Sequence, residues 1–293
     1  MLLSTQTEVL AEKITEKEAI KIIAEAGFDA YDISLFNVGS NSGYGFNTEN
    51  YLKLAKELKE YADSLGIVCN QSHAPFPSSV GDEEKDAKIF QNIVRAMEIA
   101  SILGAKIIVV HPKQHLCYAE NIEKLFEINV EFYKSLIPYC EKFGIKVATE
   151  NMWQYNPNTQ SPIDSTCSRA WEFNKYIDAL DSEWIVGCLD IGHVSLMNTD
   201  IPTFIKEMGN KRLRALHVHD TDFVHDCHTL PFMKKIDYNA VMKALAEIDY
   251  MGDLTFEADC FFEGKPMELY PATSRYMCEV GRYLISEVEK NRK

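Results

Sequence analysis

The sequence lacks any segment suited to crossing or entering a membrane. Its apolar runs all fall short of the roughly 18 residues that a membrane-spanning helix needs. The opening segment, residues 1–13, has neither the basic start nor the continuous apolar stretch of a signal peptide. We therefore expect a cytoplasmic protein that has no membrane partner.

Positive charge is also scarce. The 293 residues include 30 Lys and Arg against 44 Asp and Glu, which gives a formal net charge of −14. The basic residues are scattered, and the only close groups are the C-terminal KNRK and the trio Lys211, Arg212 and Arg214. Because nucleic acids and anionic membranes bind proteins through clustered cations, neither is an expected partner.

Two common motifs of cysteine and glycine are absent as well. The eight cysteines are dispersed and contain no CxxC pair, so neither a disulfide framework nor a thiolate metal site is indicated. In a reducing compartment they are small apolar residues of the core. No glycine-rich loop follows the first predicted strand, which argues against a doubly wound sheet that binds a dinucleotide.

What the chain does have is a regular alternation of amphipathic helices and short apolar runs. Gly27, Gly66, Gly104 and Gly144 recur about every 39 residues, each where a helical pattern stops and an apolar run begins. The first of these helices opens with TEKE at Thr15, a capping box. The predicted strands are 2–6, 30–36, 67–76, 106–112, 146–151, 184–193, 213–220 and 253–259. Eight strands that alternate with helices predict an α/β fold, a (β/α)8 TIM barrel, with residues 1–293 as a single domain.

Three carboxylates stand at the carboxyl ends of the predicted strands, where barrel enzymes carry their chemistry. Glu150, Asp190 and Glu257 lie within or directly after apolar runs, in KVATEN, GCLDIGH and LTFEAD. A buried carboxylate without a partner is costly, and lysine or arginine is scarce at these strand ends. Together with His217 they form an oxygen-rich set with one nitrogen, which suits a divalent metal such as Mn, Co, Mg or Zn.

Further residues of the metal-ligating kind fall at the same predicted mouth: His73, His111, His193, Asp226 and His228. A single histidine at a strand end is more often structural, so these five are assigned to additional metals or to substrate only as a group. His115, His219 and His225 break the pattern and are interpreted as loop residues or as supports for the ligands. Asp220 and Asp222 are candidates to orient the ligating imidazoles.

The order of these motifs resembles the xylose isomerase-like barrel superfamily. ATEN, CLDIGH, ALHVHDTD followed by DCH, and TFEAD occur in that order, and the resemblance covers nearly the whole chain. The superfamily includes sugar and sugar-phosphate isomerases and epimerases, among them D-tagatose 3-epimerase-like enzymes, and also endonuclease IV. The motifs identify the superfamily and do not choose among its members.

Similarity to the ketose epimerases implies one metal, with manganese as the first choice, held by Glu150, Asp190, His217 and Glu257. Glu150 and Glu257 would be the catalytic acid/base pair on opposite sides of the sugar, and the metal would stabilise the enediolate that forms between two proton transfers. His193 would bind a substrate hydroxyl. These epimerases carry a substrate-binding arginine shortly after the histidine of strand seven, whereas residues 222–224 here read DFV.

Similarity to endonuclease IV implies a different use of the same mouth. All nine ligand positions of its trinuclear zinc site have a counterpart here: His73, His111, Glu150, Asp190, His193, His217, Asp226, His228 and Glu257. The charge of −14 comes without a basic stripe for DNA, so a metal-dependent sugar or sugar-phosphate isomerase or epimerase is the preferred prediction. The alternatives are an endonuclease IV-like phosphodiesterase acting on abasic DNA, a dehydratase or lyase acting on a ketosugar, and an inactive barrel that binds a sugar for regulation.

Two long loops are the candidates for contacting a sugar. Segments 37–47 and 152–162 are rich in aromatic and amide groups. Tyr44, Trp153 and Tyr155 are the predicted stacking residues, and the same aromatics would suit a subunit contact, which leaves a homo-oligomer open. Lys113, shortly after His111, is the cation best placed to help if the sugar carries a phosphate.

Overall fold

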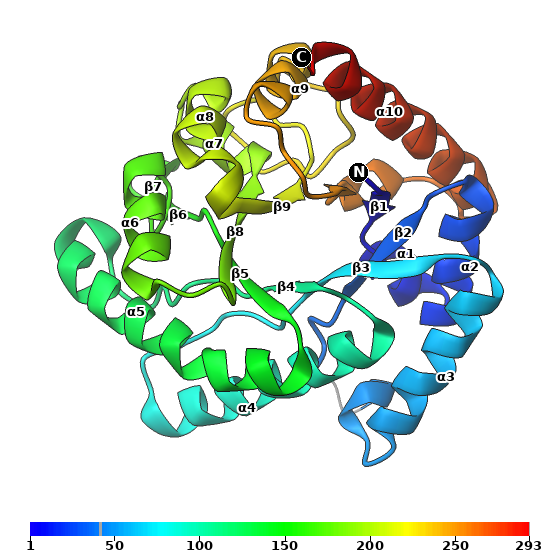
Figure 1. Ribbon diagram of the computed structural model, residues 1–293, viewed down its shortest axis with the longest axis horizontal. Coiled ribbons are helices and arrows are strands. Elements are labelled where there is room, and N and C mark those ends of the chain that lie inside the picture. Colours follow the sequence, from blue (N-terminus) through cyan, green and yellow to red (C-terminus); the bar gives the residue numbers. More distant parts are fainter. Residues whose placement is uncertain (41–42, 293) are drawn as a thin grey trace.

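Eight parallel strands form a ring that Figure 1 shows end-on, with helices around its outside. The computed structural model describes residues 1–40 and 43–292, so positions 41 and 42 of the predicted 37–47 loop lie outside the described residues. The strands of the ring are β1 (Leu3–Thr5), β2 (Ala30–Ser34), β3 (Val68–His73), β4 (Ile107–Val109), β5 (Lys146–Glu150), β8 (Ile185–Asp190), β9 (Leu213–His217) and β10 (Leu254–Phe256). Each falls inside a segment that the sequence predicts as a strand.

The ring is closed by two short seams. Strands β2, β3, β4, β5, β8 and β9 pair side by side in that order, and β1 pairs with β10. Parallel bridges join Gln6 to Asp32 and Val218 to Phe256, which links β1 to β2 and β9 to β10. At the second seam, the Val218 N–H donates to the carbonyl of Thr255 at 2.9 Å. The closed barrel confirms the predicted fold over the open sheet.

The helices form the outer layer of the barrel. The long ones are α2 (Glu16–Ala26), α3 (Tyr51–Ser64), α4 (Glu83–Leu103), α5 (Tyr118–Phe143), α6 (Ala170–Leu180), α8 (Ile201–Arg212), α9 (Tyr238–Glu247) and α10 (Tyr270–Asn291). Two short helices, α1 (Glu8–Lys13) and α7 (Ile191–Leu196), follow β1 and β8. Three short 3-10 helices complete the set: η1 (Gly45–Asn47), η2 (Asp259–Phe262) and η3 (Met267–Leu269). Among the described residues, no helix is both long and apolar enough to span a bilayer.

Helix α2 shows how local sequence sets these boundaries. The Thr15 hydroxyl accepts the Glu18 N–H at 3.2 Å, which satisfies one of the free amide groups of the first turn. At the other end Gly27 has φ +97°, a left-handed conformation that glycine adopts without steric cost. The predicted helix start at Thr15 and the glycine stop are confirmed, although the Glu18 carboxylate accepts from the Thr15 hydroxyl at 3.1 Å and not from its backbone N–H as in a full capping box.

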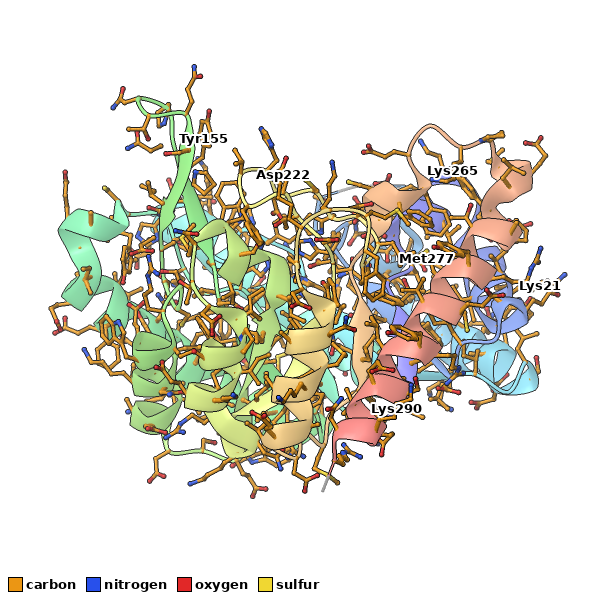
Figure 2. The ribbon with its side chains drawn as sticks, turned by 90° about the horizontal axis from the view of Figure 1, so that it is seen from above. Lys21, Tyr155, Asp222, Lys265, Met277 and Lys290 are labelled. Carbon is orange, nitrogen blue, oxygen red and sulfur yellow. The ribbon has the colours of Figure 1, made fainter. Side chains whose placement is uncertain are left out.

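Two parts of the chain differ from the sequence-based expectation. The predicted strand 184–193 ends at Asp190, whose carboxylate accepts the His193 N–H at 2.6 Å and caps α7, so His193 lies on a helix. The loop after β5 contains an antiparallel hairpin, β6 (Trp153–Asn156) with β7 (Ser161–Asp164). Figure 2 shows the labelled Tyr155 on this hairpin, which projects from the same end of the barrel as Asp222.

Candidate metal centre

The barrel interior leads directly into the candidate centre. Alternate side chains of a strand face the same way, so residues two positions apart share the inside of the ring. Ala148, Cys188 and Ala215 pack together inside it, apart from the core beneath the helices. Two positions further along the same strands stand Glu150, Asp190 and His217. The strand period therefore carries these three side chains into the mouth of the barrel.

The first ligand group consists of Glu150, Asp190, His217 and Glu257, each of which offers an atom within 4.8 Å of the others. Nδ1 of His217 lies 3.2 Å from Oε1 of Glu150 and 3.1 Å from Oε2 of Glu257. All four residues are buried. The structure thus brings together the four residues that the sequence predicts as ligands of one metal.

A second group shares Glu150 with two histidines from neighbouring strands. Oε2 of Glu150 lies 3.1 Å from Nε2 of His111 and 3.6 Å from Nε2 of His73. His73 ends β3, and His111 comes two residues after β4. Because the other oxygen of Glu150 faces His217, this carboxylate stands between the two groups.

The third group gathers around Asp226, in the loop after β9. Oδ2 of Asp226 lies 3.3 Å from Nε2 of His193 and 3.2 Å from Nε2 of His228. His219 belongs to the same group. All nine residues predicted at this mouth therefore lie in these three adjoining clusters, and a further overlapping group of His73, His217 and Glu257 links the first two.

Hydrogen bonds to the main chain orient three of these imidazoles. Nδ1 lies 2.8 Å from the Ala74 carbonyl in His73, 2.8 Å from the Asn151 carbonyl in His193, and 3.1 Å from the Glu257 carbonyl in His228. A carbonyl oxygen only accepts, so in each ring Nδ1 carries a proton and donates it. Nε2 is then left to face the carboxylates, which is the arrangement of a metal-ligating histidine.

The charges of the clusters fit divalent cations. Burial opposes the charged imidazolium, but the carboxylates of Asp190 and Asp226 raise the pKa of His193 to about 10. Burial also opposes ionisation of Glu150, but His217 and His111 hold the pKa of this carboxyl well below its usual range. Oxygens of Glu150, Asp226 and Glu257 are buried with no hydrogen-bond partner in the described part of the chain. A divalent metal between such oxygens and the histidine nitrogens would supply a positive charge that they share.

The clusters open into a cavity of about 910 Å³ at the carboxyl ends of the strands. Its carboxylates are Glu8, Glu12, Glu150, Asp226, Glu257, Asp259 and Glu263. No lysine or arginine lines it among residues 1–40 and 43–292. A neighbouring cavity of about 840 Å³ shares Glu8, Glu12 and Phe36 with it. The mouth is therefore a roomy, acidic depression.

Comparison with known proteins identifies the family. A family model described as xylose isomerase-like TIM barrel matches residues 20–279. The chain belongs to the xylose isomerase-like TIM barrel family. This confirms the membership that the sequence motifs predict.

Relatives of this family member include uncharacterised and named proteins. The uncharacterised protein MJ1311 of Methanocaldococcus jannaschii is 27% identical over 85% of this chain and 80% of its own length. The putative L-ribulose-5-phosphate 3-epimerase SgbU of Haemophilus influenzae is 22% identical over 85% of this chain and 86% of its own length. A solved D-tagatose 3-epimerase-like protein has a TM-score of 0.77 at 20% identity and covers 99% of both chains, which shows the shared fold.

Three polar residues support the ligand clusters of this family member. The Gln6 amide donates to Oε1 of Glu257 at 2.9 Å, and the Asn151 amide donates to the Asp190 carbonyl at 2.9 Å. His219 is fully buried, and its Nε2 lies 3.0 Å from both carboxylate oxygens of Asp190. The sequence offered no signal for Gln6 or Asn151, whereas His219 follows the strand rhythm of His217 by two positions.

His219→Ala should lower the affinity for metal by roughly 10- to 100-fold, because Asp190 loses the donor that orients it. Calorimetric titration of the metal-free protein with MnCl₂ or ZnCl₂ measures this, and thermal melts establish that the variant is folded. His225→Ala is the matched control, since His225 is an exposed histidine of the same loop. Equal affinity in the two variants would remove His219 from this supporting role.

The hairpin places its two predicted stacking residues differently. Trp153 lines the cavity, and its Nε1 donates to Oδ2 of Asp226 at 3.2 Å. Tyr155 is 56% exposed and does not line the cavity, because the hairpin carries it away from the mouth. Only Trp153 is placed to meet a substrate.

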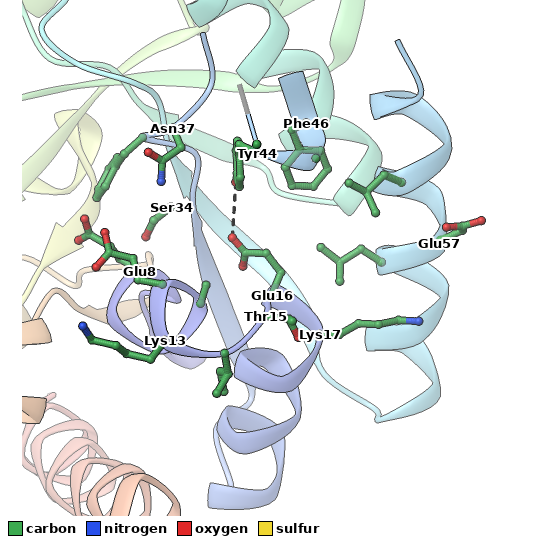
Figure 3. Close-up of a pocket in the computed structure, with 18 residues that line it drawn as sticks. Glu8, Lys13, Thr15, Glu16, Lys17, Ser34, Asn37, Tyr44, Phe46 and Glu57 are labelled. Carbon is green, nitrogen blue, oxygen red and sulfur yellow. Dashed lines mark hydrogen bonds between the residues drawn. The ribbon is translucent and has the colours of Figure 1, made fainter. Parts of the chain in front are cut away.

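Tyr44 and Lys113 also lie outside the mouth. The Tyr44 hydroxyl donates to Oε1 of Glu16 at 3.4 Å within the neighbouring cavity (Figure 3). The Lys113 ammonium lies 5.1 Å from the ring centroid of Phe132, on α5, and is absent from the lining of the mouth. Neither residue is among those that line the cavity at the clusters.

The two aspartates predicted to orient imidazoles do other work. Asp220 accepts the N–H groups of residues 234–236 and fixes the long loop after β9. Asp222 lies 2.9 Å from Nδ1 of His225, an exposed histidine outside the clusters. Neither orients a histidine of the clusters, because the path of this loop turns both side chains elsewhere.

Proposed function

We propose that this chain is a metal-dependent epimerase or isomerase of an unphosphorylated ketose, with Glu150 and Glu257 as its acid/base pair. One observation carries the proposal. These two buried carboxylates, from β5 and from the end of β10, both lie within 3.2 Å of Nδ1 of His217, and each keeps an oxygen without a hydrogen-bond partner among the described residues. Paired carboxylates of this kind suit removal and return of a proton beside a carbonyl group.

The surroundings of the two carboxylates suit these roles. Burial opposes ionisation of Glu257, but His217 and His228 hold its pKa well below the usual range, so it is kept in the ionised form that a base requires. The Gln6 amide donates to Oε1 of Glu257, and Oε2 faces Nδ1 of His217 at 3.1 Å. Strands β8 and β9 separate β5 from β10 on one side of the ring, so the two groups reach the mouth from different directions. A planar enediolate between them would meet one carboxylate on each face.

The residues fit a divalent metal, with manganese as our first choice and zinc, cobalt or magnesium as alternatives. Glu150, Asp190, His217 and Glu257 would hold it, and it would polarise the oxygens of the substrate and so make the carbon-bound proton more acidic. His73, His111, His193, Asp226 and His228 would hold further metals or contact the substrate. Oxygen ligands with one imidazole favour Mn²⁺ at the first group, whereas the histidine-rich third group favours Zn²⁺.

The charge of the mouth favours a substrate without phosphate. The relative from H. influenzae is named for a ketose phosphate. In this chain the described lining offers Glu8, Glu12 and Glu263 outside the clusters and no lysine or arginine, while burial raises the pKa of Asp259 to about 8 and keeps this carboxyl largely uncharged at neutral pH. A phosphate group that reached this rim would be repelled.

Incubation of the metal-loaded protein with ketopentoses and ketohexoses in D₂O tests the proposal. We expect a new epimer or isomer with solvent deuterium on a carbon next to the carbonyl. We also expect kcat/KM for the matching ketose phosphate to be at least about tenfold lower. A faster reaction with the phosphate would contradict the charge argument alone. Proton NMR spectra of the reaction measure this, and loss of water or cleavage of the sugar in these spectra would indicate a dehydratase or lyase.

An endonuclease IV-like phosphodiesterase is the second candidate, because the nine matching residues fall into three clusters that could each take a metal. Such an enzyme must also grip phosphates, which the acidic lining of this mouth does not favour. Cleavage of an abasic-site duplex at physiological salt separates the candidates. Robust cleavage without turnover of any ketose would replace the first proposal, and binding of a ketose without turnover would indicate a regulatory barrel.

A further inference from the structure

His115 and its partners form a polar device at the rim of the mouth, outside the ligand clusters. The loop after β3 carries Ser79, the loop after β4 carries His115, and both residues line the cavity. Ser79 Oγ lies 2.7 Å from Nδ1 of His115 and 2.6 Å from Oδ2 of Asp86, in the first turn of α4. The serine hydroxyl thus stands between a carboxylate and an imidazole.

The direction of the hydrogen bonds between Asp86, Ser79 and His115 follows from the protons that each group carries. Burial disfavours the ionised form of Asp86, but hydrogen bonds from the Ser79 hydroxyl and the Val80 N–H keep the pKa of Asp86 below its usual value. An ionised carboxylate only accepts, so the single hydroxyl proton of Ser79 points to Asp86. Oγ of Ser79 must then accept from His115, and Nδ1 of His115 carries the proton. In the neutral ring this leaves Nε2 as an acceptor.

Two features of His115 prepare it to accept a hydrogen bond: Nε2 lacks a partner among the described residues, and neighbouring residues hold the imidazole ring. Nε2 of His115 has no hydrogen-bond partner in the described ranges 1–40 and 43–292, and the imidazole faces the cavity. Gly81 packs against the ring, because a Cβ there would lie 3.0 Å from Cδ2 of His115. The hydrogen bond to Ser79 and the contact with Gly81 hold the ring, so Nε2 is preorganised as a hydrogen-bond acceptor.

We propose that Nε2 of His115 accepts a hydrogen bond from a substrate hydroxyl remote from the reacting carbons, and that Ser79 and Asp86 position it by fixing its tautomer. His115 is then a specificity-determining residue that selects a hydroxyl donor. A phosphate or a keto oxygen at that position has no proton to offer and is disfavoured. The choice of a sugar hydroxyl as the donor rests on the proposed function.

The tautomer is tested without any substrate. Nitrogen-15 spectra of the zinc-loaded protein, recorded above the titration of the ring and with the His115 signals assigned by their loss in His115→Gln, should show the proton on Nδ1. Ser79→Ala should abolish this preference. A proton on Nε2 would overturn the proposal whatever the enzyme acts on.

The selected hydroxyl is tested with a set of single-deoxy analogues of the best ketose substrate. For the analogue that lacks the selected hydroxyl, the kcat/KM of the wild type should be roughly tenfold lower than with the parent sugar, through a higher KM. The kcat/KM of His115→Ala should be the same with this analogue as with the parent sugar. For analogues that lack another hydroxyl, kcat/KM should fall by the same factor in the wild type and in His115→Ala. His115→Gln, whose amide oxygen reaches the place of Nε2, should restore part of the loss.

Each result has one meaning. Equal losses for every analogue in wild type and His115→Ala would assign His115 a structural role and refute the proposal. If no ketose is turned over while the spectra show the proton on Nδ1, the proposed function fails and the preorganised acceptor stands. If the spectra fail while a ketose reacts, the function stands and the assignment of His115 falls.

Discussion

Replacing Glu257 or Glu150 with glutamine should lower the epimerisation or isomerisation rate by roughly 10²- to 10⁴-fold, the usual contribution of a positioned acid or base. An amide cannot take a proton from carbon, yet it matches the carboxylate in size. Glutamine at position 257 still offers an oxygen to Gln6, whose amide donates to Oε1 at 2.9 Å in the wild type. The matched size should preserve the packing around each residue, and thermal melts of the metal-loaded variants check that they are folded.

The two variants should fail in different ways. If each carboxylate serves one face of the sugar, each variant should keep exchange with deuterium for one epimer and lose it for the other. Proton NMR of both epimers in D₂O measures this directly. Glu60→Gln, the same substitution on the exposed face of α3, is the control and should behave as wild type. Turnover within about tenfold of wild type in Glu150→Gln or Glu257→Gln would defeat the acid/base assignment.

The barrel fold could be predicted from the sequence because its strands are buried on both faces. Such strands appear as short apolar runs such as KIIVV, and the long helices α2 to α5 end at or next to a glycine that permits a left-handed turn, as at Gly27. The sequence did not predict the hairpin after β5, because WQYN and SPID are half-exposed segments that carry no periodic apolar signal. His193 was misplaced for a related reason: the apolar run continues past Asp190 although the strand stops there.

The ligand clusters were predictable for a physical reason that the loops do not share. Residues at the ends of parallel barrel strands converge on one mouth, so Glu150, Asp190 and His217 are brought together by strand period alone. Loop residues follow no such rule. Lys113 turns outward to α5, and His115 enters the cavity through its bond to Ser79, although the two are only two positions apart. Their placement depends on partners that sequence spacing does not reveal.

Removing the divalent metal should abolish turnover and lower the melting temperature. At a free metal concentration of about 100 times Kd, binding contributes about 2.7 kcal/mol, which corresponds to roughly 4–5 °C in a chain of this size. Dialysis against a chelator, followed by thermal melts and assays with Mn²⁺, Zn²⁺, Co²⁺ or Mg²⁺ restored singly, measures both effects. Asp190→Asn should lose most of the metal-dependent shift, whereas Glu60→Gln should keep it. Full activity in protein shown by elemental analysis to be free of metal would refute the metal requirement.

The affinity for metal should also fall as the pH falls. Without metal, the pKa of His193 is raised to about 10 by Asp190 and Asp226, and that of His217 is raised well above its usual value by nearby acidic groups, in both cases against the effect of burial. Metal must displace these protons, so acidification favours release of the metal.

Elemental analysis after stepwise acidification also counts the metal sites. One exchangeable metal would match the cluster of Glu150, Asp190, His217 and Glu257, whereas two or three per chain would show that the histidine-rich clusters are filled and would strengthen the phosphodiesterase alternative.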